Sequence, residues 1–234
     1  MMNFSIIIPI YNEELNINQL IEEILISTLK FKNNFEIILV NDASLDKSLK
    51  EIYKIQKQYP KVIKIVNNNK NIGQSYSLIE GIKESIYDII ITLDGDGQNN
   101  PKDIPLLLNK YLSDKSLGLV GGIRANRKDS LIKIITSKMA NSFRQYILKD
   151  NCEDTGCSLK VFDKNIFMKF PFFNGIHRFL PALYKGYGIN TFFVKVDHRY
   201  RKFGHSKYGT FGRLFRGIRD LIKVAKIINK IKNK

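Results

Sequence analysis

The feature that most constrains the fold is a series of five short apolar runs, rich in Ile and Val, within the first 122 residues. Each run is apolar on both faces, which is typical of central strands in a parallel sheet. Longer segments of mixed polarity separate them. We therefore expect strands at FSIIIP (4–9), FEIILV (35–40), VIKIV (62–66), DIIITL (88–93) and LGLVGG (117–122).

The segments between these runs predict helices. In residues 12–25, Asn12 is a plausible cap, acids follow in the first turn, and the apolar residues form an imperfect helical stripe. A strand–helix repeat predicts an α/β fold with an open, mostly parallel sheet flanked by helices. With 234 residues, 44% of them hydrophobic, the chain can fill one core and carry a small appended region. We expect that division at residues 1–210 and 211–234.

Ligands of such sheets bind beyond the carboxyl ends of the strands. Four loops leave those ends, and all carry polar side chains suited to a nucleotide: residues 9–14, 40–46, 67–74 and 93–101. None of the four has the G-x-G-x-x-G or Walker pattern. This argues against a nicotinamide enzyme and against a P-loop phosphotransferase.

The fourth loop, LDGDGQNNP (93–101), places two carboxylates one residue apart. Like charges this close hinder each other's ionisation, so a positive partner is expected. Asp94, Asp96 and Gln98 offer only hard oxygen ligands, which suit Mg²⁺ or Mn²⁺ and disfavour zinc. The alternative is a polar turn with solvated carboxylates, and the position after the fourth strand favours the metal site.

Positive charge is concentrated at the C-terminal end. The chain has a net charge of +16, and residues 199–234 supply +11 of it, from 12 Lys/Arg and one acid. This pattern suits an anionic partner at that end: a membrane surface, a nucleic acid or a phosphate. The N-terminus lacks the features of a signal peptide, and no run approaches the roughly 18 apolar residues of a membrane span. Cys152 and Cys157 cannot form a disulfide framework, which favours a reducing intracellular compartment.

Residues 211–234 predict a basic amphipathic helix. Such a helix can lie in the headgroup layer of an anionic membrane, or its apolar stripe can pack on the domain. The sequence leaves these two alternatives equal. The expected apolar side comprises Leu214, Ile218, Leu221, Ala225 and Ile228, and the basic side Arg216, Arg219, Lys223, Lys226 and Lys230.

Five motifs together resemble the family-2 glycosyltransferases of the GT-A fold, in particular the dolichol- or polyprenol-phosphate mannosyltransferase branch. They are IIIPIYNEE, VNDASLD, NNKNIGQ, LDGDGQ and the late element FGHSKYG (203–209), and the similarity covers nearly the whole chain. The resemblance implies a nucleotide-sugar donor, a polyprenyl phosphate acceptor, a divalent metal and action as a peripheral protein on the cytoplasmic face of a membrane. It leaves open which sugar and base are used, whether the chain forms a homo-oligomer, and whether it needs a separate membrane subunit.

The resemblance also implies roles for individual residues. The nucleotide-sugar side would comprise Pro9, Tyr11, Asn12, Glu13, Asp42, Asn71, Gly73, Arg201 and Lys207. The metal ligands would be Asp94, Asp96 and Gln98. The acceptor phosphate would be bound by Arg124, with Lys133, Ser137 and Ser206. In the segment EDTGCSLKVF (153–162), Asp154 matches the family's acid, but Cys157 and Ser158 replace its usual Ser-Gly pair. Plain alternatives are that Pro9 ends a strand, that Asp42 caps a helix, and that the arginines are solvated.

The implied reaction is an inverting attack by a polyprenyl phosphate oxygen on the anomeric carbon of the donor, with mannose favoured by resemblance. A phosphate acceptor is already anionic, so no general base is needed. If the acceptor were a hydroxyl of an envelope glycan, a base would be required, and Asp154 would be the first candidate. A nucleic-acid-binding module ranks well below both, because it leaves the acidic loop unexplained. No role is expected for His177, His198 or His205.

Overall fold

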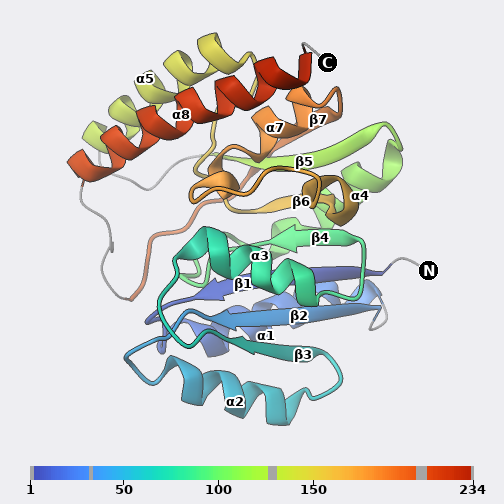
Figure 1. Cartoon of the computed structure of the whole chain (residues 1–234). Helices are drawn as coiled ribbons and strands as arrows, with labels where there is room; N and C mark the ends of the chain where they lie inside the picture. The colour runs from blue at the N-terminus through green and yellow to red at the C-terminus, as the bar shows by residue number, and fades with distance from the viewer. Residues whose placement is uncertain (1–2, 32–33, 126–130, 204–209, 233–234) are drawn as a thin grey trace.

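The computed structural model describes residues 3–31, 34–125, 131–203 and 210–232, and a seven-stranded sheet forms its centre (Figure 1). The strand order is β3-β2-β1-β4-β6-β5-β7. Strand β6 runs antiparallel to both of its neighbours, whereas the other pairs are parallel. The strands are β1 (Phe4–Ile10), β2 (Phe35–Asn41), β3 (Ile63–Asn67), β4 (Ile89–Thr92), β5 (Leu117–Arg124), β6 (Lys160–Asp163) and β7 (Asn190–Val196).

Helices cover both faces of the sheet, and each face has its own buried cluster. Ile6 and Ile8 of β1 belong to the first cluster and Ile7 to the second, because successive side chains of a strand point to opposite faces. The first cluster includes residues of α1 (Ile17–Thr28), α2 (Ser48–Gln58) and α4 (Ile104–Ser113). The second includes residues of α3 (Gln74–Glu84), α6 (Lys164–Phe167), α7 (Leu180–Gly186) and α8 (Thr210–Lys232). Helix α5 (Leu131–Leu148) lies beside α8 at one end of the molecule, and short 3₁₀ turns occur at Leu29–Phe31, Pro101–Asp103 and Ile176–Arg178.

The mostly parallel α/β sheet expected from the sequence is confirmed, and all five predicted strands are present to within two residues at each end. Their apolar composition follows from burial on both faces: every residue of β2 is buried. Strands β6 and β7 were not predicted.

The predicted helix start at Asn12 is wrong, because α1 begins at Ile17. Asn12 has a left-handed backbone, with φ 54°, which Asn adopts more readily than most residues. Its side-chain oxygen accepts a hydrogen bond from Leu45 N at 2.7 Å. Residues 11–16 therefore form a loop tied to the loop after β2, and the acids expected in the first helical turn lie in that loop.

Helix α8 is present as predicted, but its apolar stripe divides into a buried and an exposed part. Leu221, Val224 and Ile228 are buried in the second cluster, where α8 packs against α7. Ile218, expected on the same side as Leu221, is instead 45% exposed. Among the described residues, no helix has the length and apolar character needed to span a bilayer.

Candidate active site

The loops after β1 and β2 are joined through the residues predicted to contact a nucleoside. The backbone N–H of Asn12 donates to Ser44 Oγ at 3.0 Å, and that of Glu13 donates to Ser48 Oγ at 2.8 Å. The Glu13 carboxylate accepts a hydrogen bond from Asn16 Nδ2 at 2.7 Å. Glu13 is buried, and Tyr11 on the same loop is partly buried. These hydrogen bonds fix the loop against the start of α2.

Asp42 organises the loop between β3 and α3. Its Oδ1 accepts from Ile72 N at 2.9 Å and its Oδ2 from Gly73 N at 2.8 Å. Asn71 Nδ2 donates back to the Asp42 carbonyl at 3.3 Å. Gly73 has φ +85°, a backbone conformation that favours glycine. The alternative that Asp42 caps α2 is wrong, because Asp46 accepts the Ser48 N–H there.

The two-carboxylate loop follows β4 directly. Asp94 Oδ1 accepts from Gln74 Nε2 at 2.7 Å, and Asp96 Oδ1 accepts from Gln98 N at 3.1 Å. Both side chains are partly buried. Burial raises the pKa of Asp94, and burial together with the nearby charge of Asp94 raises the pKa of Asp96 to about 6. The site is therefore short of positive charge at these two carboxylates.

A divalent cation would fit this shortage. Asp94 and Asp96, with one residue between them, supply the hard oxygen ligands that Mg²⁺ and Mn²⁺ prefer. Within the described residues, no group of three or more His, Cys, Asp and Glu side chains is placed to hold a metal. An ion on Asp94 and Asp96 would thus keep positions open for substrate oxygens. The predicted third ligand, Gln98, donates from Nε2 to the Arg199 carbonyl at 3.3 Å, which ties the loop to residues 197–203.

Residues 197–203 cross over the loops after β1 and β4. Arg201 Nη2 pairs with Glu13 Oε1 at 2.5 Å, and its Nη1 lies 3.4 Å from Asp96 Oδ2. Arg199 N donates to the Gln98 carbonyl at 2.9 Å. The predicted surface alternative for Arg201 is wrong, because its side chain is 20% exposed and bound between two carboxylates. This guanidinium places a positive charge beside the Asp94–Asp96 loop.

Arg124 and Asp154 form an ion pair at the end of β5. The Arg124 Nε lies 2.7 Å from Asp154 Oδ2, and its Nη2 lies 2.8 Å from Oδ1, which makes the pair bidentate. The backbone N–H groups of Arg124 and Gly156 also donate to this carboxylate, at 3.2 and 3.1 Å. Two residues predicted separately, one for acceptor phosphate and one as a possible base, are thus bound to each other.

The other predicted residues have varied positions. Pro9 lies within β1, as the predicted strand 4–9 has it, and the strand ends one residue later at Ile10. Lys133 and Ser137 lie in α5, and their side chains belong to the part of that helix that the structure does not describe. Ser206 and Lys207 lie outside the described residues. Cys157 is buried, and burial raises the pKa of its thiol to about 11, as expected for a packed residue.

Sequence reasoning missed three polar residues beside Asp94. Gln74, Lys160 and His177 line, with Asp94, an enclosed cavity of about 20 Å³, enough for one water molecule. Lys160 is buried on β6, and its Nζ donates to the Cys157 carbonyl. His177 shares a 2.7 Å hydrogen bond with Ser75 Oγ. Gln74 closes the motif NIGQ and could have been recognised there, whereas nothing local distinguished Lys160 or His177.

Comparison with known proteins agrees with this architecture. The sequence profile described as glycosyl transferase family 2 matches residues 5–173. A dodecaprenyl-phosphate galacturonate synthase from Rhizobium johnstonii is 35% identical over 226 residues, covering 95% of this chain and 66% of the relative. An undecaprenyl-phosphate 4-deoxy-4-formamido-L-arabinose transferase from Pectobacterium atrosepticum is 35% identical over 220 residues, covering 94% and 66%. The chain thus spans slightly less than two thirds of the length of these relatives.

Solved structures show the same fold at lower identity. A mannosyltransferase from Pyrobaculum calidifontis, in complex with GDP-Man and Mn²⁺, has a TM-score of 0.66 at 18% identity, covering 97% of this chain and 64% of that one. Glucosyl-3-phosphoglycerate synthase from Mycobacterium tuberculosis, with Mn²⁺, UDP and glucosyl-3-phosphoglycerate, has a TM-score of 0.69 at 14% identity, covering 97% and 79%. These likenesses support the GT-A fold. The profile match over most of the chain shows that the protein belongs to glycosyltransferase family 2.

Proposed function

We propose that this protein transfers a sugar from a nucleotide sugar to a polyprenyl phosphate at a membrane surface. The observation that carries the proposal is the meeting, at one edge of the sheet, of the Asp94–Asp96 loop with the guanidinium of Arg201. A second arginine, Arg124, is the last residue of β5, and only β6 separates β5 from β4 in the sheet. This arrangement suits two anionic substrates. Two relatives are named for dodecaprenyl phosphate and undecaprenyl phosphate, which supports the same class of acceptor.

The donor side is proposed to lie over the loops after β1, β2 and β3. Asp42 Oδ1 accepts from Ile72 N and also from Asn68 Nδ2 at 3.0 Å, whereas Oδ2 accepts from Gly73 N and keeps a lone pair for a base or a ribose. Tyr11, Asn12, Glu13 and Asn71 would form the remaining walls. Arg201 pairs with Glu13 and Asp96 in the structure, and an incoming diphosphate would compete for its guanidinium.

Mg²⁺ or Mn²⁺ is proposed to bind Asp94 and Asp96, with Gln98 as a further oxygen ligand. Bound there, the cation would supply positive charge for the leaving diphosphate. Arg201, and in the proposal Lys207, add positive charge on the same side. The low local polarity that raises the pKa of Asp96 also strengthens these interactions.

Arg124 is proposed to bind the acceptor phosphate. Its side chain is only 13% exposed and fixed in orientation by Asp154, so its guanidinium is pre-organised for a second anion. An ionised phosphate attacks without a general base, which leaves Asp154 the task of positioning Arg124. Lys133, Ser137 and Ser206 stay predictions for the same phosphate.

The identity of the sugar also stays a prediction. Mannose is favoured by resemblance, whereas the two named relatives are called galacturonate and 4-deoxy-4-formamido-L-arabinose enzymes. Location on the cytoplasmic face of a membrane is proposed for the same reason as the lipid acceptor.

The test is a measurement of nucleoside diphosphate release from a panel of GDP and UDP sugars, with and without undecaprenyl phosphate in detergent. We expect release from one donor to rise at least tenfold when the lipid phosphate is added, with sugar recovered on the lipid. Nucleoside diphosphate release that is unchanged by the lipid phosphate but rises with a glycan acceptor would contradict the proposal. Asp94→Asn serves as the inactive control.

A further inference from the structure

The outer face of α5 presents large apolar side chains to solvent. Met139, Phe143 and Tyr146 are 70%, 58% and 82% exposed. Their spacing of four and three residues places them on one side of the helix, and we call them the α5 outer stripe. A row of exposed apolar side chains marks an interaction site more often than single exposed apolar residues do.

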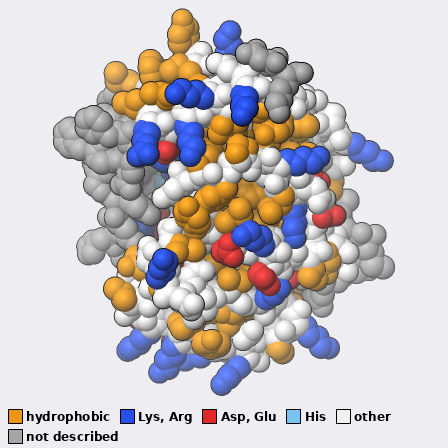
Figure 2. All heavy atoms as spheres, viewed as in Figure 1, with side chains coloured by type: hydrophobic (Ala, Val, Ile, Leu, Met, Phe, Trp, Pro, Cys, Tyr) orange, Lys and Arg blue, Asp and Glu red, His pale blue; other side chains and the backbone are white. Residues whose placement is uncertain are grey.

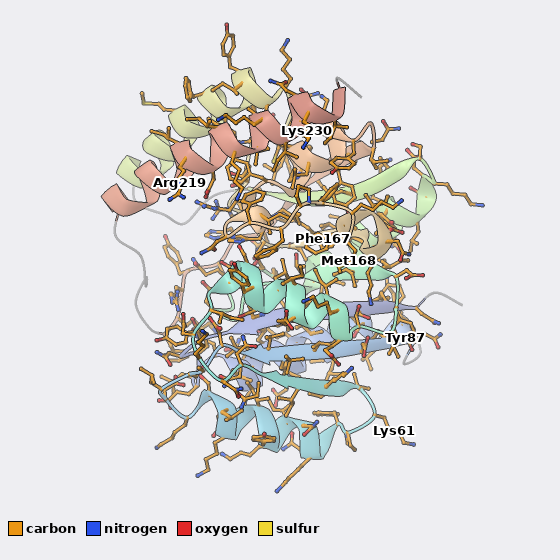
Figure 3. The ribbon with its side chains drawn as sticks, in the orientation of Figure 1. Lys61, Tyr87, Phe167, Met168, Arg219 and Lys230 are labelled. Atoms are coloured by element: carbon orange, nitrogen blue, oxygen red, sulfur yellow. The ribbon has the colours of Figure 1, made fainter. Side chains whose placement is uncertain are left out.

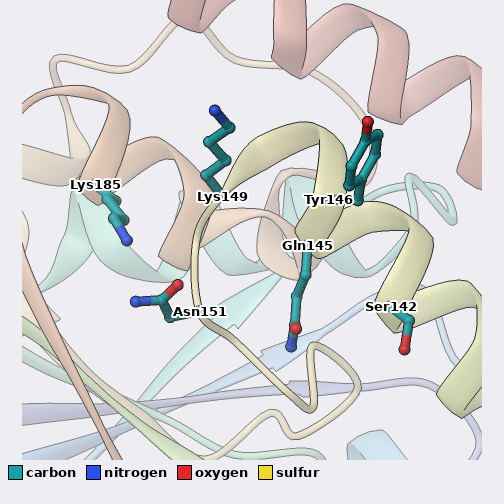
Figure 4. Close-up of a pocket in the computed structure, with 6 residues that line it drawn as sticks. All are labelled: Ser142, Gln145, Tyr146, Lys149, Asn151 and Lys185. Carbon is teal, nitrogen blue, oxygen red and sulfur yellow. The ribbon is translucent and has the colours of Figure 1, made fainter.

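Basic side chains lie at one end of the α5 outer stripe. Lys149 and Lys185 line the same surface hollow as Tyr146, and Tyr146 and Lys149 point to the same side of the helix end (Figure 4). Helix α5 and the neighbouring α8 contain one acidic residue, Asp220, and it is paired with Arg178 at 2.7 Å.

Helix α8 repeats this combination. Ile218 and Ile222 are 45% and 53% exposed, one turn apart. The exposed basic residues of α8 include Arg219, Lys223, Lys226 and Lys230, and the first and last of these lie toward opposite ends of the helix (Figure 3). Figure 2 shows basic and hydrophobic side chains interspersed over the end of the molecule where α5 and α8 lie. Apolar anchors among cations fit the headgroup layer of an anionic bilayer.

The opposite face of α5 holds the loop that carries Asp154. Asn141 Nδ2 donates to the Glu153 carbonyl at 2.8 Å, and its Oδ1 accepts from Thr155 Oγ1 at 3.1 Å. Gln145 Nε2 donates to the Cys152 carbonyl at 2.7 Å. Arg144, buried between them, pairs with Asp150. One helix therefore joins the exposed stripe to the loop that orients Arg124.

We propose that the α5 outer stripe docks on an anionic lipid bilayer and that this contact holds residues 150–156, with the Arg124–Asp154 pair, in place for the acceptor. The docking is inferred from the exposed side chains of α5 and α8 alone, whereas its role in acceptor binding rests on the proposed function. Membrane contact would then order the acceptor side of the site at the same surface that holds a lipid acceptor.

Docking is tested by sedimentation with vesicles of phosphatidylcholine containing 30% phosphatidylglycerol as the probe. The double variant Phe143→Ser/Tyr146→Ser should bind about tenfold more weakly, because it removes two aromatic anchors. The matched control is Ile26→Ser/Leu29→Ser on the distant α1 side, where both residues are more than 60% exposed, and it should bind as the parent does. Equal binding by all three proteins would overturn the proposal. So would a parent dimer, seen by light scattering, that the double variant dissociates without any vesicle binding.

The link to residues 150–156 is tested by hydrogen exchange with and without the same vesicles, in the absence of donor and polyprenyl phosphate. Exchange of the amides in this loop should slow at least threefold in the parent. In Asn141→Ala/Gln145→Ala, vesicle binding should persist while that slowing is lost. Unchanged exchange in vesicle-bound parent protein would refute the link. Because no sugar transfer is measured, a failed activity assay would count against the proposed function and not against this inference.

Discussion

At the scale of single residues, the Arg124–Asp154 pair distinguishes the two possible acceptors. Asp154 accepts hydrogen bonds from Arg124 N, Nε and Nη2 and from Gly156 N. We expect Asp154→Asn to raise the KM for the lipid phosphate about tenfold, because Arg124 loses its charged partner, and to lower kcat less. Initial rates at varied acceptor and saturating donor measure both, with the melting temperature as a check on folding.

A different result would be expected if Asp154 were a base for a hydroxyl acceptor. The Asn variant would then lose kcat at unchanged KM, and the parent rate would fall at acid pH as the carboxylate became protonated. Glu80→Gln, at a partly exposed acid in a helical ion pair with Lys83, provides a charge-matched control that should leave both constants unchanged.

His177 should make stability depend on pH. Burial, with the nearby charges of Arg178 and Lys160, lowers its pKa to about 3 from an ordinary value near 6.5. Below pH 6.5 the unfolded chain binds a proton that the folded chain does not, so stability is lost as the pH falls. The slope due to this residue is at most about 1.4 kcal/mol per pH unit. Urea unfolding between pH 7.5 and 4.5 should show a shallower loss for His177→Asn, and parallel curves would contradict the assignment.

Local motifs predicted many of the candidate site residues, but not their partners. The positions of Asp42, Asp94 and Asp96 after their strands follow from the parallel sheet, because consecutive strands present their carboxyl ends at one edge. The pairing of Arg201 with Glu13 joins residues 188 positions apart, and nothing in either segment specifies it. Lys160 was missed because a lysine in an apolar run gives no local sign of burial.

At the scale of elements, the success of the strand predictions depended on burial. Strands β1, β2 and β4 lie side by side with apolar runs on both faces and are readily recognised. Strand β6 has only four residues, and β7 lies at the sheet edge with most residues partly or fully exposed, so neither gives a continuous apolar run. The antiparallel insertion of β6 between β4 and β5 depends on long-range pairing that periodicity does not report.

Helix α8 offers a direct test of how its stripe is used. Leu221 is 5% exposed in the second cluster, whereas Ile222 beside it is 53% exposed. Leu221→Ala should lower the free energy of unfolding by about 2–3 kcal/mol, because it leaves a cavity. Ile222→Ala, the matched control, should change it by less than about 0.5 kcal/mol. Urea denaturation measures both, and similar losses for the two variants would mean that α8 does not pack as described.

At the scale of the whole molecule, the acidic candidate site and the excess of positive charge lie in different parts of the chain. The acids of the candidate site lie at the carboxyl edge of the sheet, while the excess of positive charge belongs to the last 36 residues, which include α8. A chain that used its positive charge to bind nucleic acid would not need the acids of the candidate site. A nucleotide-sugar enzyme with a soluble acceptor would not need the excess of positive charge in the last 36 residues. The combination suits a reaction between a soluble donor and an acceptor held in an anionic layer.

The donor and the metal should stabilise the folded molecule together. A ligand that binds only the native state at 100 times its Kd adds about 2.7 kcal/mol, which is roughly 5–10 °C in melting temperature for a chain of this size. We expect a shift of this order with the correct nucleotide sugar and Mn²⁺, and a much smaller one with either alone. The reason is that Asp94 and Asp96 bring two negative charges to a site that must also accept a diphosphate. In the double variant Asp94→Asn/Asp96→Asn, the donor-induced shift in melting temperature should no longer depend on Mn²⁺, as it does in the parent. A full shift that persists in EDTA would show that the two carboxylates do not hold the ion that binds the donor.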